Sequence, residues 1–302
     1  MKVFIAAIDG LEYNLVEKWD IGRFKQAKYG RHDVKVAVRE GDPLYTPLIW
    51  ASFLLGQPAY KYGFDMNYIQ SRKAEYGYNP ILRLLFKARL RLLGSRRLGV
   101  REFLSRIGLF NSEAVRRTTH KIEVMPSELV EKTFIHEARR RGYRVWYRNI
   151  PSLPGDKYAE YRAFLYKYFD ADVSERLRML NKLYNESEAD LVDALKAVDD
   201  GYDLIVYYTP LLDEAHHMLY RPGKPKLMVR LRRYYRLVEE QVGRIAETLG
   251  GDWVLLIVSD HGYDPSIHEH SDYGFWSFSR GLDYEPRTIL DFRRIIEDLL
   301  YG

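Results

Sequence analysis

The chain has 302 residues, 46% hydrophobic and 29% charged, a composition that suits a folded domain with a large core and excludes a disordered chain. It contains no cysteine, which excludes disulfides, thiolate metal ligands and thiol nucleophiles, so any metal must be held by His, Asp, Glu or hydroxyl groups. The net charge is +5, but the segment 83–117 has ten Lys/Arg and two acids and carries +8, which leaves −3 elsewhere.

The sequence predicts strands where apolar residues run together or alternate with polar ones. In chain order these segments are 3–8, 33–38, 143–147, 203–208, 253–258 and 275–278. Segments 3–8 and 253–258 are apolar throughout, which is typical of fully buried strands. Segment 33–38 alternates, which favours a half-buried or edge strand.

Helices are expected between most of these strands. Their segments are 48–55, 127–141, 172–198, 227–249 and 289–300. The first is apolar on every side, with Thr46 as N-cap, Pro47 as first helical residue and Gly56 as terminator, and Ser127 is expected to cap the second. The alternation of strands and helices predicts an α/β fold, a three-layer sandwich with a largely parallel central sheet and helices on both faces.

Segment 68–124 interrupts this alternation. Tyr, Arg and Leu dominate it and no strand pattern is visible, so we expect a small helical cap inserted into a single domain of residues 1–302. Its basic part, 83–117, has three interpretations: a solvated cap, a rim that attracts anionic substrates, or a patch that contacts a membrane surface or nucleic acid. The solvated cap is the preferred interpretation, and leucines among the arginines keep peripheral membrane contact open as an alternative: Leu84, Leu85, Leu90, Leu92 and Leu93. No nucleic-acid-binding module accompanies them.

Targeting and membrane-spanning segments are not expected. The apolar run at 3–8 is too short for a signal peptide, and no run reaches the ~20 residues of a membrane span. We therefore expect a cytoplasmic protein. Abundant Arg, Lys, Glu and Tyr with little Gln is typical of a thermophile.

Polar side chains gather where the predicted strands end, which is where ligands bind in open α/β sheets. Asp9 follows the first strand, Thr46 stands at the start of the buried helix, Asp213 and His217 follow 203–208, and Asp260-His261 follow 253–258. Five of the eight histidines lie within 216–270.

Carboxylates and imidazoles in this pattern indicate a metal site. Asp213 and His217 are four apart, so on a helix they share one face and reach one ion. Asp260 and His261 are adjacent, so diverging side chains favour two different ions. Two cations together clamp a phosphoryl group, and a metal activates a hydroxyl such as that of Thr46.

Each residue also has an ordinary structural explanation. Asp9 suits a turn at a strand end, Thr46 a helix cap, and Asp213 an ion pair with His217. Asp260 with His261 suits a surface turn. His268 and His270 suit an exposed loop, and one of them is expected to lie there.

The sequence resembles the alkaline phosphatase superfamily, and within it the type I phosphodiesterase/nucleotide pyrophosphatase family. The resemblance covers nearly the whole chain and rests on Ile8-Asp9-Gly10, the segment 46–56, Tyr62-Gly63-Phe64, Asp213 through His217, Ser259-Asp260-His261-Gly262, and His270 with Gly274. One departure is Tyr62-Gly63, where the family usually has His-Gly; that His is generally not a ligand.

The resemblance implies a role for each site residue. One metal would be held by Asp9, Thr46, Asp260 and His261, and the other by Asp213, His217 and His270. Thr46 would be the nucleophile that forms a phosphoryl-threonine, and Asn67, twenty-one residues later, would donate to the phosphoryl oxygen. His270 is preferred over His268 because Gly274 follows it by four residues, and His217 over His216 because of its spacing from Asp213.

The implied activity is that of a metal-dependent phosphoryl-transfer hydrolase of the phosphodiesterase/nucleotide pyrophosphatase type. Its cofactors would be two divalent ions, Zn first and Mn as the alternative, and its substrates small phosphate esters or nucleotides. Four alternatives stay open: a phosphomonoesterase or phosphomutase of the same superfamily, a phosphonate or sulfate ester hydrolase, a non-catalytic protein that binds lipid or nucleic acid through 83–117, and a catalytically silent metalloprotein. The sequence makes no prediction of oligomeric state.

Overall fold

A six-stranded sheet forms the centre of the computed structural model, which describes residues 1–93, 109–169 and 171–302. The strands are β1 (Lys2–Ile8), β2 (Lys28–Asp33), β3 (Val145–Tyr147), β4 (Leu204–Thr209), β5 (Trp253–Val258) and β8 (Tyr273–Phe278). Their order is β2-β8-β5-β1-β4-β3, with β5, β1, β4 and β3 paired in parallel and β8 antiparallel to both its neighbours. The prediction of an α/β fold with a largely parallel sheet is confirmed.

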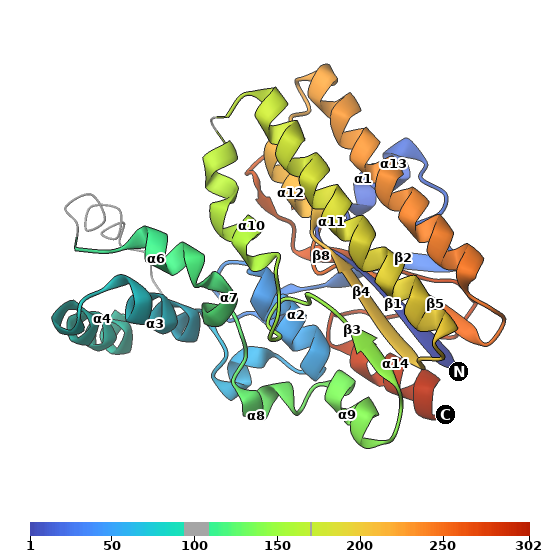
Figure 1. Ribbon diagram of the computed structural model, residues 1–302, viewed down its shortest axis with the longest axis horizontal. Helices are drawn as coiled ribbons and strands as arrows, with labels where there is room; N and C mark the ends of the chain where they lie inside the picture. Colours follow the sequence, from blue (N-terminus) through green and yellow to red (C-terminus); the bar gives the residue numbers. More distant parts are fainter. Residues whose placement is uncertain (94–108, 170) are drawn as a thin grey trace.

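Helices cover both faces of this sheet (Figure 1). The described helices are α1 (Tyr13–Trp19), α2 (Thr46–Leu55), α3 (Met66–Gly77), α4 (Pro80–Leu93), α6 (Ser112–Arg117), α7 (Thr119–Ile122), α8 (Ser127–Val130), α9 (Phe134–Arg140), α10 (Ala159–Phe164), α11 (Val173–Asp199), α12 (Leu211–Leu219), α13 (Pro225–Thr248) and α14 (Asp291–Tyr301). Short 3₁₀ turns span Lys35–Ala37, Ala59–Tyr62 and Leu165–Tyr168, and a two-residue ribbon pairs β6 (Tyr263–Asp264) with β7 (Glu269–His270).

Two neighbouring residues of β4 show how the layers are divided. Successive side chains of a strand point to opposite faces. The Tyr207 hydroxyl lies 2.6 Å from Ser187 Oγ of α11 and 3.2 Å from Gln241 Oε1 of α13. The Tyr208 ring instead packs edge-on against Trp50 of α2, with centroids 5.7 Å apart. α11 and α13 therefore cover one face, and α2, packed with α9 and α14, covers the other.

The predicted strand at 33–38 is wrong, because the strand lies earlier, at Lys28–Asp33. Residues of β2 pair with β8 up to Asp33, opposite Tyr273. The Asp33 carboxylate then accepts a hydrogen bond from Lys35 N at 2.8 Å and turns the chain into a 3₁₀ helix. The alternation of polar and apolar residues in 33–38 therefore belongs to a turn and not to a strand.

Two predicted helix starts also differ from the structure. α2 begins at Thr46 itself, with Tyr45 as N-cap and no side-chain capping bond, so the prediction that Thr46 caps the helix is wrong. The predicted helix 127–141 is two helices, α8 and α9. They are separated because Thr133 Oγ1 donates to Val130 O at 2.7 Å and caps α9, and Ser127 is the first residue of α8 and not its cap.

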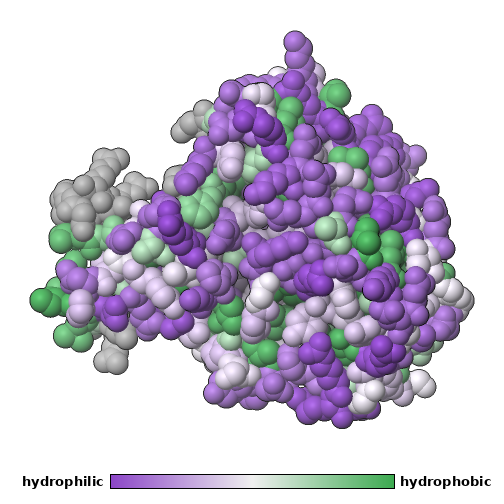
Figure 2. Space-filling view, in the orientation of Figure 1, coloured by the Kyte–Doolittle hydropathy of each residue, from purple (hydrophilic) through white to green (hydrophobic). Residues whose placement is uncertain are grey.

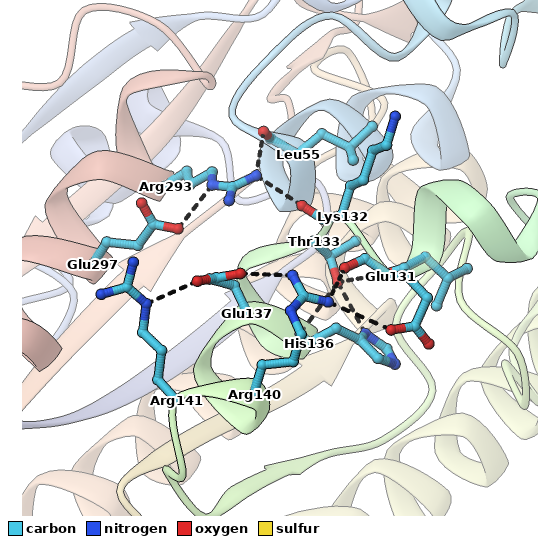
Figure 3. A network of polar contacts seen from close by, with 11 residues as sticks. Leu55, Glu131, Lys132, Thr133, His136, Glu137, Arg140, Arg141, Arg293 and Glu297 are labelled. Carbon is cyan, nitrogen blue, oxygen red and sulfur yellow. Dashed lines mark hydrogen bonds and ion pairs between the residues drawn. The ribbon is translucent and has the colours of Figure 1, made fainter.

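A polar network holds the carboxyl end of α2 against α9 and α14 (Figure 3). Gly56 ends α2 in the left-handed conformation, φ 62°, as predicted. Arg293 of α14 donates from Nη1 to Leu55 O at 2.9 Å and to Lys132 O at 2.8 Å. A cation at this position satisfies carbonyls that the last helical turn leaves free.

Helices α3, α4, α6 and α7 occupy the part of the chain predicted to form the cap, and they project from one side of the sheet (Figure 1). The boundaries 68–124 stay a prediction. The middle of the basic segment 83–117, residues 94–108, lies outside the described residues. No helix in the described ranges is long and apolar enough to span a membrane.

Candidate metal centre

Three acidic residues meet at the carboxyl edge of the sheet because they follow three neighbouring parallel strands. Asp9 directly follows β1, Asp260 follows β5 after one residue, and Asp213 lies in the first turn of α12, after β4. Asp213 N donates to Asp9 O at 3.1 Å. A Cβ on Gly10, which has φ 72°, would lie 2.7 Å from Asp213 Cα, so this close approach requires glycine.

The first ligand group surrounds one imidazole nitrogen. His261 Nε2 lies 3.2 Å from Asp9 Oδ1, 3.3 Å from Asp260 Oδ2 and 3.3 Å from Thr46 Oγ1. All four side chains are buried. The structure thus brings together residues from the ends of β1 and β5 and from the start of α2.

The second group lies beside the first. Asp213 Oδ1 is 3.4 Å from His217 Nε2 and 3.5 Å from His270 Nε2, and the two imidazole nitrogens are 3.3 Å apart. The ring of His261 stacks on that of His270, with centroids 3.6 Å apart and planes 9° apart. Asp213, His261 and His270 can also offer atoms within 4.8 Å of one another, so His261 borders both groups.

The spacing of these atoms fits bound cations. Two ligand atoms ~2.0–2.1 Å from a tetrahedral ion stand about 3.3–3.4 Å apart. Asp9 Oδ1, Asp213 Oδ1 and both carboxylate oxygens of Asp260 are buried and accept no hydrogen bond. Buried carboxylate oxygens are costly unless a cation or donor compensates them. The residues present therefore suit one divalent ion in each group.

The pKa shifts of residues in these groups also favour bound cations. Burial, reinforced by the nearby Asp9, raises the pKa of Asp260 well above its usual range. Burial alone would lower the pKa of His261, but Asp260 and Asp9 raise it to about 10. In the second group burial opposes ionisation of Asp213, yet His217 and His270 lower its pKa. In the first group, the carboxylates thus concentrate negative charge where a divalent cation would balance it.

Contacts behind the first group orient its ligands. His261 Nδ1 lies 2.9 Å from Gly262 O, and because a carbonyl only accepts, Nδ1 carries a proton, which leaves Nε2 as the nitrogen that would bind a cation. The Tyr208 hydroxyl donates to Asp9 Oδ2 at 2.5 Å. Ser259 Oγ donates to His261 O at 2.6 Å and bends the chain after β5. The expectation that Asp260 and His261 diverge is therefore wrong, because it assumed an extended backbone.

The sequence left two choices of candidate ligand open, His216 or His217 and His268 or His270, and the structure distinguishes between the members of each pair. His216 is a buried core residue, with Nε2 2.9 Å from the Tyr235 hydroxyl and its ring stacked on Tyr263. Burial lowers the pKa of His216 to about 3, so it is neutral. His268 is exposed, with φ 56°, in the turn between β6 and β7. His217 and His270 are the members that reach the cluster.

Asn67 is the second residue of α3. Asp65 caps this helix by accepting from Tyr68 N at 2.9 Å, and it pairs with Arg39 at 2.8 Å. The Asn67 amide oxygen is buried without a hydrogen-bond partner. Its role as a donor to the phosphoryl group stays a prediction.

A chain of polar contacts beside Thr46 was not predicted from the sequence. The Tyr45 hydroxyl donates to Glu123 Oε1, and Glu123 Oε2 pairs with Arg162 Nη2 at 3.3 Å. The same Arg162 nitrogen pairs with Asp156. These residues are dispersed between 45 and 162, so no local spacing marks them.

Two groups of carboxylate and imidazole side chains beside a hydroxyl, at the open edge of an α/β sheet, are an arrangement that metal-dependent hydrolases use. Residues 3–274 match the family described as type I phosphodiesterase / nucleotide pyrophosphatase. The match spans nine-tenths of the chain, so the chain belongs to this family, as the sequence motifs predicted. It is therefore a hydrolase that acts on phosphoester bonds.

Solved structures similar to this chain include the PH0037 protein from Pyrococcus horikoshii, at 13% identity and a TM-score of 0.48, with 99% of this chain and 96% of that chain covered. Murine ectonucleotide pyrophosphatase / phosphodiesterase 5 is similar at 14% identity and a TM-score of 0.40. That match covers 87% of this chain and 57% of the murine chain. An inactive threonine-to-alanine variant of the murine protein, in complex with AMP, gives 13% identity and a TM-score of 0.37, over the same shares of both chains. No curated protein matches the chain.

Proposed function

We propose that this chain cleaves phosphodiester or nucleotide pyrophosphate bonds, with Thr46 as nucleophile and two divalent cations as cofactors. The observation that carries the proposal is the position of Thr46 Oγ1, 3.3 Å from the His261 nitrogen on which the first ligand group converges. The family supplies the class of bond, and the geometry supports the residue assignments.

The first cation would be held by Asp9, Thr46, Asp260 and His261, and the second by Asp213, His217 and His270. Carboxylate and imidazole ligands at this spacing favour Zn, with Mn as the alternative. When bound, the two ions lower the pKa of the Thr46 hydroxyl and of a water molecule, and they neutralise charge on the phosphoryl group.

Thr46 Oγ1 attacks the phosphorus in line with the departing group. The hydroxyl loses its proton to solvent, a bond forms from this oxygen to phosphorus, and the ester or anhydride bond breaks. The departing oxygen leaves with the electron pair. Water then attacks the phosphorus of the phosphoryl-threonine, and the bond from phosphorus to Oγ1 breaks. The product leaves as a phosphate monoester, and one proton of the water restores the Thr46 hydroxyl. The first turn of α2 assists because the positive end of a helix dipole favours the phosphoryl negative charge.

The chain's own residues keep this geometry in place. The Gly262 carbonyl orients His261, and the Tyr208 hydroxyl orients Asp9. Asn67 would donate from its amide to a phosphoryl oxygen, which favours a diester over a monoester.

Hydrolysis of bis(p-nitrophenyl) phosphate and of p-nitrophenyl phosphate, measured together with bound metal, tests the proposal. Thr46→Ala should lower turnover about a thousandfold or more while the metal content stays at the wild-type level, because the other ligands remain. Thr46→Ser should keep part of the activity. Unchanged hydrolysis in Thr46→Ala would rule out the nucleophile, and a preference for the monoester would favour a phosphomonoesterase.

A further inference from the structure

Helix α4 has an apolar face that is turned to solvent. Ile81, Leu84 and Leu85 are 76%, 71% and 62% exposed. Residues three and four apart lie on one side of a helix, so these side chains form one continuous face, to which the exposed Ala88 belongs by its spacing. Ile81, Leu84, Leu85 and Ala88 together form the outer face of α4.

The opposite side of α4 already has its packing partners. Leu82 and Phe86 pack on the core, and the Phe86 ring lies 5.3 Å from that of Tyr78. Tyr78 in turn contacts Phe110 at 4.7 Å. The outer face is therefore not needed to hold α4 in place, and its apolar side chains call for another explanation.

The outer face is also unusual for this molecule. Other large apolar side chains exposed in the described part of the chain are scattered over other elements, as is normal for a surface. Figure 1 places α4 at the end of the part that projects from the sheet, and Figure 2 shows hydrophobic residues on the outer edge of that part.

Charge identifies what would cover this face. The fourteen residues of α4 include four Lys/Arg and no acid, within a segment that carries +8. A second copy of the chain would bring the same positive charge to the contact and be repelled. Nucleic acid would attract the arginines but leave the leucines exposed to water. An anionic lipid surface accommodates both the basic and the apolar side chains, because its headgroups attract cations and the layer just below them takes up apolar side chains.

We propose that the protein docks on anionic membranes through the outer face of α4. The helix would lie in the plane of the surface, with Ile81, Leu84 and Leu85 in the boundary layer of the lipid. Three side chains give a weak and reversible contact that depends on the charge of the lipid and on salt.

The test is co-sedimentation of the full chain with vesicles of phosphatidylcholine alone and of phosphatidylcholine with phosphatidylglycerol. We expect binding to the anionic vesicles, at least fivefold weaker binding to the neutral ones, and loss of binding at high salt. The double substitution Leu84→Glu with Leu85→Glu should abolish binding. Val229→Glu on α13 is the matched control, because Val229 is as exposed as Leu84 and also lies on a basic helix.

Unfolding temperatures of the variants, expected to match the wild type, show that each protein is folded. The proposal is overturned by absence of vesicle binding, by equal binding to neutral vesicles, or by binding that the α4 double variant retains. A dimer in light scattering that dissociates in the same variant would assign the outer face to a second copy, and it would also overturn the proposal.

Discussion

His261 lies at the point where the two ligand groups meet. Its Nε2 faces Asp9, Asp260 and Thr46, and its ring stacks on His270. One side chain thus contacts the proposed nucleophile and residues of both groups. A shift of about 1 Å at such a position can cost a hundredfold in rate.

The pair His268 and His270 offers a sharp comparison, because the two residues share one short turn. His270→Ala should reduce the bound metal by one ion per chain and lower diester hydrolysis about a hundredfold, since Asp213 and His217 lose their third partner. His268→Asn should leave both quantities unchanged, because His268 is exposed and Asn tolerates its positive φ. Metal analysis of both variants checks this, and metal loss in the His268 variant would reverse the assignment.

For individual residues, the sequence predicts which chemical groups form the site better than it predicts the contacts between them. The spacing of Asp213 and His217 on one helix face was enough to place them together. The hydrogen bond from Tyr208 to Asp9 was not predictable, because it joins residues 199 positions apart. The relation of Asp260 to His261 was predicted incorrectly, because the bend held by Ser259 is not visible in the pattern.

Among elements, the contact between Tyr45 and Glu123 joins the start of α2 to the end of α7. Glu123→Gln should lower turnover about ten- to a hundredfold with both metals retained, because Tyr45 and Arg162 lose a charged partner next to Thr46. Glu113→Gln is the control, since the pair between Glu113 and Arg117 is exposed and contributes little. Steady-state kinetics with metal analysis checks the prediction, and equal activities in the two variants would contradict it.

The end of α2 gives a test of stability that is independent of catalysis. Gly56→Ala should destabilise the protein by about 2–4 kcal/mol, because φ is 62° and a Cβ would lie 2.6 Å from Arg293 Cδ. Gly41→Ala has a similar φ of 82° but nothing within 4 Å, so it should lose only about 1 kcal/mol from the backbone conformation. Denaturant unfolding measures both, and equal losses would show that the contact with Arg293 is harmless.

Element boundaries were the weaker part of the sequence prediction. The buried strands 3–8, 203–208 and 253–258 and the long helices 172–198 and 227–249 match the structure to within a few residues. The strand at 33–38 was misplaced because β2 is an edge strand whose polar residues give little signal. The order of the six strands in the sheet was also not predictable from the sequence, because it depends on which strands pair.

For the whole molecule, the buried charges predict that metal contributes to stability. Chelation should lower the unfolding temperature by several degrees, because ions that bind the folded state stabilise it by about 4 kcal/mol per site at 1,000 times Kd. Calorimetry with EDTA, followed by addition of Zn or Mn, checks the prediction, and the better of the two ions indicates the natural metal. An unfolding temperature that chelation leaves unchanged would show that the clusters are stable without cations.

The proposed function depends on two cations that lie side by side, held by residues that follow β1 and β5 and by residues of α2, α12 and β7. Anomalous X-ray diffraction from crystals grown with Zn tests it directly. We expect two peaks about 3.5–4 Å apart, one bound by Asp9, Asp260 and His261 and the other by Asp213, His217 and His270. A single peak, or peaks at other residues, would contradict it.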